Sequence, residues 1–231
     1  MHRRATLFYA AHLVVLTFAA FLWATRAEAG ICVDIDLHVG VQHVSRDLPV
    51  ALEREATAIW APYGVDLRWS PHECAVEDAS FEVWIDAHVS VVDRQASGTI
   101  LGSTRVQQAR IDRVPISVDY DAMEKTLGSL TSAQITPFFG SRIGPDEMGR
   151  ACGRVVAHEI GHVLLGLSRH EQSGLMRQSF AAAELVQLGR RPYRLSSEDV
   201  GRLRQRSTIM SHLERVPPAI ETADIAEATG D

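Results

Sequence analysis

Hydrophobic and polar residues alternate in several short stretches of this 231-residue chain, and such alternation predicts β-strands. The clearest stretch spans residues 31–39, and similar patterns predict strands over residues 65–69, 81–92, 99–106 and 113–120. Between the first two strands, apolar residues at helical spacing predict a helix over residues 47–60: Leu48, Leu52, Ala56 and Ile59. The order strand, helix, strand predicts a βαβ unit with a parallel pair of strands.

The second half of the chain has a helical pattern. Apolar residues surround a polar trio at positions 158, 159 and 162 and predict a buried helix there: Val155, Val156, Ile160, Val163, Leu164 and Leu165. Another helix is predicted over residues 197–213, capped by Ser196 or Ser197, and the connection over residues 121–149 has only a weak helical pattern near residues 132–139. These elements predict an α+β fold, with a mixed sheet followed by a buried helix and a small C-terminal helical part.

The polar trio belongs to the sequence His158-Glu159-Ile160-Gly161-His162. Residues four apart share one face of a helix, so His158 and His162 can present two imidazole nitrogens to one metal ion. Glu159 lies one position around the helix, close enough to take a proton from a water molecule at that metal. A buried group of two histidines and a glutamate needs a partner to offset desolvation, and Zn²⁺ is the predicted partner. Glu159 is the predicted general base, because zinc lowers the pKa of a bound water molecule to about 7.

His170 is the predicted third zinc ligand. In an unbroken helix it would lie about 12 Å beyond His162 along the axis, too far to share one metal. Gly166 can adopt the left-handed conformation that ends helices, which would let the chain turn back and bring His170 to the same ion.

These residues resemble the metzincin metalloproteases, in which HExxH, a glycine turn and a third histidine are followed by a turn that contains methionine. The matching positions are His158, Glu159, His162, Gly166, His170 and Met176. Seven residues separate His162 from His170 here, whereas the metzincin pattern has five, and this extended spacing resembles a group of exported bacterial proteins. The resemblance implies a metzincin-like fold, bound zinc and a peptide or protein substrate. By analogy with some metzincins, Tyr193 is a candidate oxyanion stabiliser, although a packed tyrosine is the favoured interpretation.

Glu184 is the alternative third ligand. It follows His162 by 22 residues, in a plausible helix over residues 181–186. That arrangement resembles the gluzincin metalloproteases, whose third ligand is a glutamate on a later helix. The glycine turn and Met176 favour His170.

The N-terminus has the pattern of a signal peptide. Arg3 and Arg4 precede an apolar run from residue 5 to residue 24, and Ala27-Glu28-Ala29 is a typical cleavage site. We expect cleavage after Ala29 and a secreted or periplasmic protein without a membrane contact. The alternative is an uncleaved membrane anchor, because the apolar run is nearly long enough to span a bilayer.

Residues 30–215 are then expected to form one metalloprotease-like domain, followed by a disordered acidic tail over residues 216–231. The full chain has a formal net charge of −6, and loss of residues 1–29 makes it more acidic because three arginines and one glutamate are removed. An acidic chain with scattered charges argues against nucleic acid as a partner. Nothing in the sequence indicates the oligomeric state.

Export permits a disulfide, and the mature chain contains Cys32, Cys74 and Cys152. Spacing alone leaves the connectivity open, although a Cys32–Cys74 bridge with Cys152 as a buried thiol is the preferred arrangement.

The sequence therefore predicts an exported zinc metallopeptidase, with zinc bound by His158, His162 and His170 and Glu159 as the base. The alternatives are an inactive, zinc-stabilised binding domain and a hydrolase of a non-peptide amide. Retention of Glu159 favours catalysis, because a structural zinc site has four protein ligands and needs no base.

Overall fold

A computed structural model of the chain describes residues 30–42, 44–74, 79–87, 101–104, 114–130 and 143–213, the last seven of these by their backbone alone. The expected signal peptide over residues 1–29 and the expected tail over residues 216–231 lie outside the described residues, so both stay predictions. Within the described ranges, no helix is long and apolar enough to cross a membrane.

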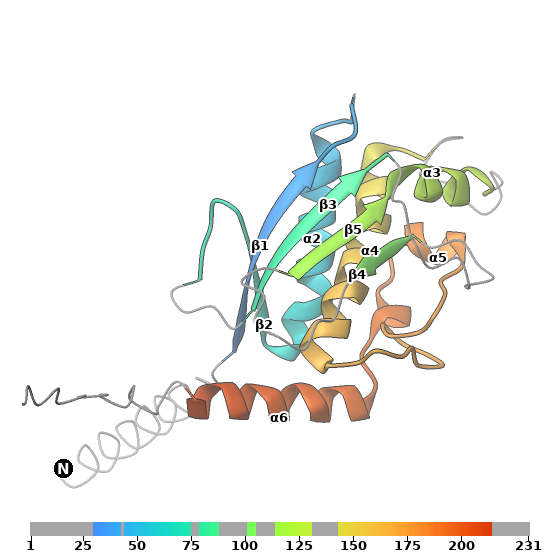
Figure 1. The fold of residues 1–231 in the computed structure, drawn as a ribbon. Helices are drawn as coiled ribbons and strands as arrows, with labels where there is room; N and C mark the ends of the chain where they lie inside the picture. Colours follow the sequence, from blue (N-terminus) through green and yellow to red (C-terminus); the bar gives the residue numbers. More distant parts are fainter. Residues whose placement is uncertain are drawn as a thin grey trace, which may run out of the picture.

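Five strands form one mixed sheet in the order β2-β1-β3-β5-β4 (Figure 1). They are β1 (Ile31–Val39), β2 (Val65–Trp69), β3 (Ala79–Asp86), β4 (Gly102–Thr104) and β5 (Val114–Asp119). β1 pairs in parallel with β2 and β3, β3 pairs in parallel with β5, and only the β4–β5 pair among these strands is antiparallel. The helix α2 (Asp47–Trp60) connects β1 to β2, so the predicted βαβ unit and the mixed sheet are confirmed.

Two long helices cover one face of the sheet. α2 and α4 (Pro145–Leu165) lie side by side behind the strands in Figure 1 and pack against each other. Gly149 and Gly153, one turn apart on α4, allow this close packing. A Cβ atom at Gly149 would collide with the carbonyl oxygen of Leu48, and one at Gly153 would lie 2.6 Å from the carbonyl oxygen of Leu52.

The structure differs from the sequence predictions between residues 81 and 144. β3 ends at Asp86 and β4 covers only Gly102–Thr104, whereas residues 88–100 and 105–113 lie outside the described residues. The helix α3 (Tyr120–Gly128) was not predicted: it follows β5 without a loop, and Asp119 caps it by accepting a hydrogen bond from the Ala122 N–H at 2.8 Å. The weak helix expected near residues 132–139 lies outside the described residues.

The C-terminal part contains α5 (Ala182–Val186), the short helix η2 (Arg191–Tyr193) and the predicted helix α6 (Ser197–Leu213). Ser196 caps α6, since its hydroxyl oxygen accepts a hydrogen bond from the Asp199 N–H at 3.1 Å. Arg206 of α6 donates a hydrogen bond to the carbonyl oxygen of Val163 at 2.7 Å, near the C-terminal end of α4. This contact links α6 to the helix that carries the candidate site.

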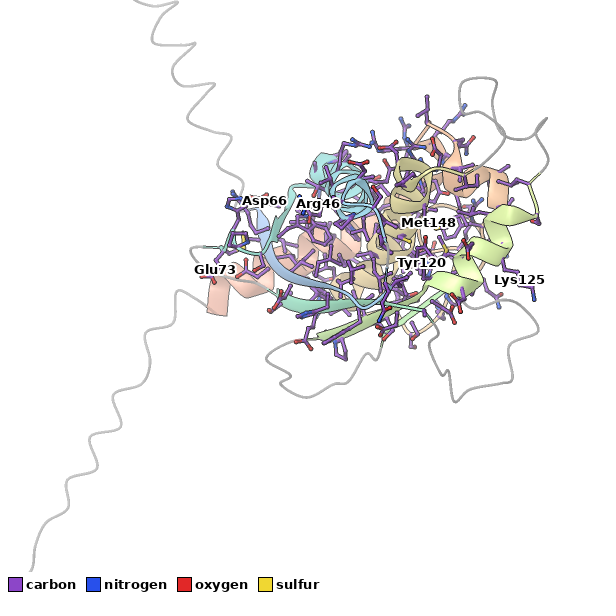
Figure 2. The ribbon with its side chains drawn as sticks, turned by 90° about the horizontal axis from the view of Figure 1, so that it is seen from above. Arg46, Asp66, Glu73, Tyr120, Lys125 and Met148 are labelled. Carbon is purple, nitrogen blue, oxygen red and sulfur yellow. A yellow bond between two sulfur atoms is a disulfide. The ribbon has the colours of Figure 1, made fainter. Side chains whose placement is uncertain are left out.

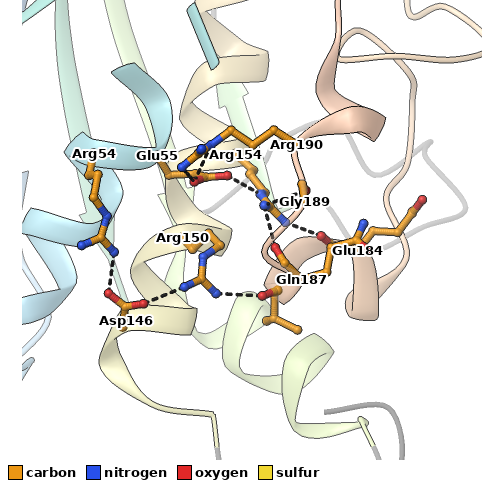
Figure 3. Close-up of polar contacts among 10 residues, drawn as sticks. Arg54, Glu55, Asp146, Arg150, Arg154, Glu184, Gln187, Gly189 and Arg190 are labelled. Atoms are coloured by element: carbon orange, nitrogen blue, oxygen red, sulfur yellow. Dashed lines mark hydrogen bonds and ion pairs between the residues drawn. The ribbon is translucent and has the colours of Figure 1, made fainter. Parts of the chain in front are cut away.

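A buried ion network joins α2, α4 and the C-terminal part (Figure 3). Glu55 of α2 accepts hydrogen bonds from Arg154 of α4 at 2.8 Å and from Arg190 at 2.7 and 2.9 Å. Arg154 is fully buried and also donates to the backbone carbonyl oxygens of Glu184, Gln187 and Gly189. Because one carboxylate serves two arginines from different segments, Glu55 holds the 184–190 segment against both long helices.

The interior is apolar and the charged residues lie around it. In Figure 2, Met148 of α4 lies inside the molecule, while Asp66, Glu73 and Lys125 lie at its periphery. Cys32 and Cys74 form the preferred disulfide, which ties β1 to the segment after β2. Cys152 is a buried free thiol, and burial raises its pKa to about 12. It lies on α4, seven residues after Pro145, the first residue of that helix.

Candidate metal centre

The helix α4 fixes the two histidines of the HExxH motif. Its first turn begins with Pro145, which is suited to this position, and the Gly144 N–H donates a hydrogen bond to the Glu147 carboxylate at 2.9 Å. The helix ends at Gly166, whose φ of +64° is the left-handed conformation predicted from the sequence. His158 and His162 are both buried on the same face of this helix.

Backbone carbonyl groups orient both imidazole rings. His158 Nδ1 lies 2.7 Å from the carbonyl oxygen of Leu175, and His162 Nδ1 lies 2.8 Å from that of Leu167. A carbonyl oxygen only accepts hydrogen bonds, so each Nδ1 carries the proton and each neutral ring has its lone pair on Nε2. The two Nε2 atoms lie 3.1 Å apart and face each other.

Two facing lone pairs repel unless a proton or a metal ion binds between them. A proton is disfavoured, because burial lowers the pKa of His158 to about 4 and also lowers the pKa of His162. Neutral imidazoles whose Nδ1 atoms donate to carbonyl oxygens are the usual form of histidine metal ligands. The two rings therefore fit a metal ion.

The turn after Gly166 brings His170 to the same place. Its ring centroid lies 5.2 Å from that of His158 and 5.0 Å from that of His162. One nitrogen from each of the three rings lies within 4.8 Å of the others, and among the described residues no other group of histidine, cysteine or acidic side chains is arranged in this way. His170 is more exposed than the other two, and burial lowers its pKa as well.

Glu184 has other partners. Its carboxylate accepts hydrogen bonds from Arg177 at 2.6 Å and from the Ala181 N–H at 2.9 Å. It therefore caps α5 and pairs with an arginine, and it does not belong to the group of three histidines.

Met176 packs beneath the candidate site. Gly174, with a φ of +78°, makes the turn, and Leu175 is held by a hydrogen bond from its N–H to the carbonyl oxygen of Arg194 at 2.9 Å. Gly161 lies between His158 and His162 in the sequence, and a Cβ atom there would collide with Met176 Sδ. This glycine therefore lets the methionine pack directly against α4.

The side chain of Glu159 on α4 lies next to the edge strand β4. Burial raises the pKa of its carboxyl group to about 8, and a hydrogen bond from the Thr104 backbone acts in the opposite direction. Gly102 of β4 makes the approach possible. A Cβ atom there would collide with Val155 and lie 3.4 Å from Glu159 Oε1.

Phe180 lies beside the site and was not predicted from the sequence. Its ring meets the His158 ring edge to face, with centroids 5.8 Å apart. No motif marks this phenylalanine, because its place depends on the fold of the whole 177–193 segment. Tyr193 is a packed core residue, 1% exposed and stacked on Phe180 at 5.0 Å, as the favoured interpretation of its sequence position predicted.

No protein-family model matches the sequence, and no curated protein matches it. Among solved structures, the fold is similar to the crystal structure of archaemetzincin from Methanopyrus kandleri, with 13% sequence identity and a TM-score of 0.44. That match covers 80% of this chain and 99% of the archaemetzincin chain. The three histidines are a candidate metal site on the geometry of this chain alone.

Proposed function

We propose that this chain is an exported zinc metallopeptidase in which His158, His162 and His170 hold the metal. The observation that carries the proposal is the 3.1 Å approach of two Nε2 atoms whose rings are both fixed by carbonyl groups at Nδ1. Three histidine ligands are the inventory of a catalytic zinc site, which keeps its fourth position for water or substrate.

Glu159 is the proposed general base. Zinc held by the three histidines would polarise the scissile carbonyl group and lower the pKa of a water molecule to about 7. Glu159 would accept a proton from that water and later donate it to the leaving amine. A hydrogen bond from the Thr104 backbone, which favours the ionised carboxylate, would hold Glu159 in place for this role.

The proposed substrate is an extended peptide. β4 lies at the edge of the sheet, beside Glu159, and its outer side has no partner strand among the described residues. An edge strand can add an extended peptide through backbone hydrogen bonds, and such pairing would bring a peptide bond to Glu159.

The proposed location is outside the cytoplasm. The signal-peptide pattern of residues 1–29 supports export, and the Cys32–Cys74 disulfide is of the kind that persists in an oxidising compartment.

The test is reconstitution of hydrolysis by zinc. The protein, freed of metal with a chelator and then dialysed, is incubated with a diverse peptide library before and after addition of one equivalent of zinc. We expect internal peptide bonds to be cleaved only after zinc is added. Zinc binding without cleavage of any peptide would favour the inactive binding domain, and cleavage confined to non-peptide amides would favour the other alternative.

A further inference from the structure

Four side chains form a continuous stack, and one of its inner members, Phe180, contacts His158 of the candidate metal centre. The Arg177 guanidinium carbon lies 4.4 Å from the centre of the Phe180 ring, and Phe180 stacks on Tyr193 with centroids 5.0 Å apart. The Arg154 guanidinium carbon lies 4.4 Å from the centre of the Tyr193 ring. We call this group the arginine–aromatic stack.

The two arginines of the stack differ in how their donors are used. Arg154 is fully buried and donates to Glu55 and to three backbone carbonyl oxygens, so its guanidinium is nearly saturated (Figure 3). Within the described ranges, the one hydrogen bond that Arg177 donates from its side chain runs from Nη2 to the Glu184 carboxylate at 2.6 Å. Its Nε atom is buried without a hydrogen-bond partner among the described residues. The contacts of Arg154 thus explain why it is buried, whereas most N–H donors of Arg177 have no acceptor in the part of the chain that the structure describes.

Arg177 lies close to the proposed reaction centre, since it covers a ring that contacts His158. Phe180, which Arg177 covers, contacts the ring of His158 edge to face. Phe180 is half-buried, and the Arg177 side chain is 20% exposed, so the pair forms part of the surface next to His158. Any substrate residue bound beside His158 on this side would meet an aromatic ring and a guanidinium group together.

Glu184 holds Arg177 in place through one of the nitrogen atoms of its guanidinium group. A single oxygen, Oε2, accepts from both Arg177 Nη2 and the Ala181 N–H, so this carboxylate is shared between the arginine and the α5 cap. A planar guanidinium binds a carboxylate through two parallel N–H groups, and Glu184 engages only one nitrogen of Arg177. The fork of Arg177 thus retains donors for a second carboxylate.

We propose that Arg177 and Phe180 form a subsite for an acidic side chain of the substrate, at a residue next to the cleaved bond. The inference rests on the proposed peptidase function and adds a substrate class to it. The carboxylate of an aspartate or glutamate would accept hydrogen bonds from the free donors of Arg177, while its methylene groups would lie against the Phe180 ring.

The experiment compares matched peptides. Each pair differs by one glutamate or glutamine, which is moved through the positions on either side of the cleaved bond. For the zinc-loaded wild type, we expect the glutamate member to have a kcat/KM about tenfold higher at one position, as for a charge-assisted hydrogen bond. Arg177→Gln should reduce this ratio to about one, and Arg177→Glu should shift the preference to lysine at the same position.

Arg190→Gln is the matched control. Arg190 is also a partly exposed arginine, but its guanidinium pairs with Glu55, whereas those over the Phe180 and Tyr193 rings belong to Arg177 and Arg154. Its variant should keep the glutamate preference, since a ratio of two peptides is insensitive to a general loss of stability. Equal rates for glutamate and glutamine peptides in the wild type, or a preference that survives in Arg177→Gln, would overturn the subsite.

A binding measurement separates this inference from the peptidase proposal. Fluorescein-labelled glutamate and glutamine peptides are titrated with the Glu159→Gln protein, and anisotropy gives their dissociation constants without turnover. Tighter binding of the glutamate peptide supports the subsite even if the wild type cleaves no peptide, in which case the peptidase proposal alone fails. Cleavage without any acidic preference in rate or binding removes the subsite and leaves the peptidase proposal intact.

Discussion

His158 and His162 present their Nε2 atoms to each other at 3.1 Å, while the Nδ1 atom of each ring is occupied by a backbone carbonyl group. Neither ring can relieve this contact by exchanging its tautomer without losing a buried hydrogen bond. The pair thus fits a shared cation, and the nearby ring of His170 offers a third nitrogen that could bind the same ion. Helix geometry creates the pair, because a four-residue spacing places both rings on one face of α4.

The first prediction concerns the base. Glu159→Gln preserves the size of the side chain and its ability to accept a hydrogen bond from Thr104, but the amide cannot take up a proton at neutral pH. We expect the variant to bind as much zinc as the wild type and to lose peptide hydrolysis. Zinc content and cleavage of a peptide library measure the two effects separately. Turnover at the wild-type rate would show that Glu159 is not the base.

The second prediction concerns the buried carboxylate of Glu55. Glu55→Gln leaves Arg154 without its ion-pair partner, and breaking a buried pair from one side costs about 3–5 kcal/mol. The free energy of unfolding, measured in urea, should fall by that amount. Arg54→Gln is the control, since the Arg54–Asp146 pair is exposed and such pairs contribute about 0–1 kcal/mol. Similar losses in the two variants would contradict the role assigned to Glu55.

The third prediction uses two helical glycines. Alanine normally stabilises a helix interior by about 1 kcal/mol relative to glycine. Gly153→Ala should instead destabilise the protein by about 1–3 kcal/mol, because the new Cβ atom would lie 2.6 Å from the Leu52 carbonyl oxygen. Gly201→Ala, at an exposed site of α6 with nothing within 4 Å, should be neutral or stabilising. Opposite signs of the change in melting temperature are expected, and a stabilised Gly153→Ala would refute the close α2–α4 contact.

Elements that depend on residues close together in the chain were predicted better from the sequence than contacts between residues far apart. The HExxH helix, the Gly166 turn and the βαβ unit each depend on residues close together in the chain, where periodicity and turn preferences act. α3 was missed because Asp119 ends a strand and caps a helix at once, so no loop separates the two patterns.

The surroundings of the site could not be predicted in the same way. Arg154 and Glu55 are 99 residues apart, and nothing near either residue indicates its partner. Arg154 lies four positions before His158 on a helix predicted to be buried. A buried arginine needs an anionic partner, so its position did indicate that a carboxylate from elsewhere in the chain packs against α4. The place of Phe180 depends on how the 177–193 segment folds back over α4, which no local pattern encodes.

The fourth prediction concerns export. Residues 1–35 fused to a reporter that is active only outside the cytoplasm should give a signal, and the mature protein should begin at Gly30. N-terminal sequencing of the secreted or periplasmic product gives the cleavage site. A mature product that retains Met1 and partitions with membranes would support the membrane anchor instead.

The zinc affinity of two alanine variants tests the central claim most directly. His170→Ala leaves only the two candidate ligands on α4. Loss of a residue that merely hydrogen-bonds to a metal ligand lowers metal affinity by up to about a hundredfold, so loss of a ligand itself should lower the zinc affinity of this variant by more than that. Glu184→Ala should bind zinc as the wild type does, because Glu184 pairs with Arg177 and caps α5. Competition with a chromophoric chelator gives both affinities and the stoichiometry, expected to be one zinc ion per chain in the wild type. Loss of zinc binding in Glu184→Ala together with its retention in His170→Ala would contradict the three-histidine site.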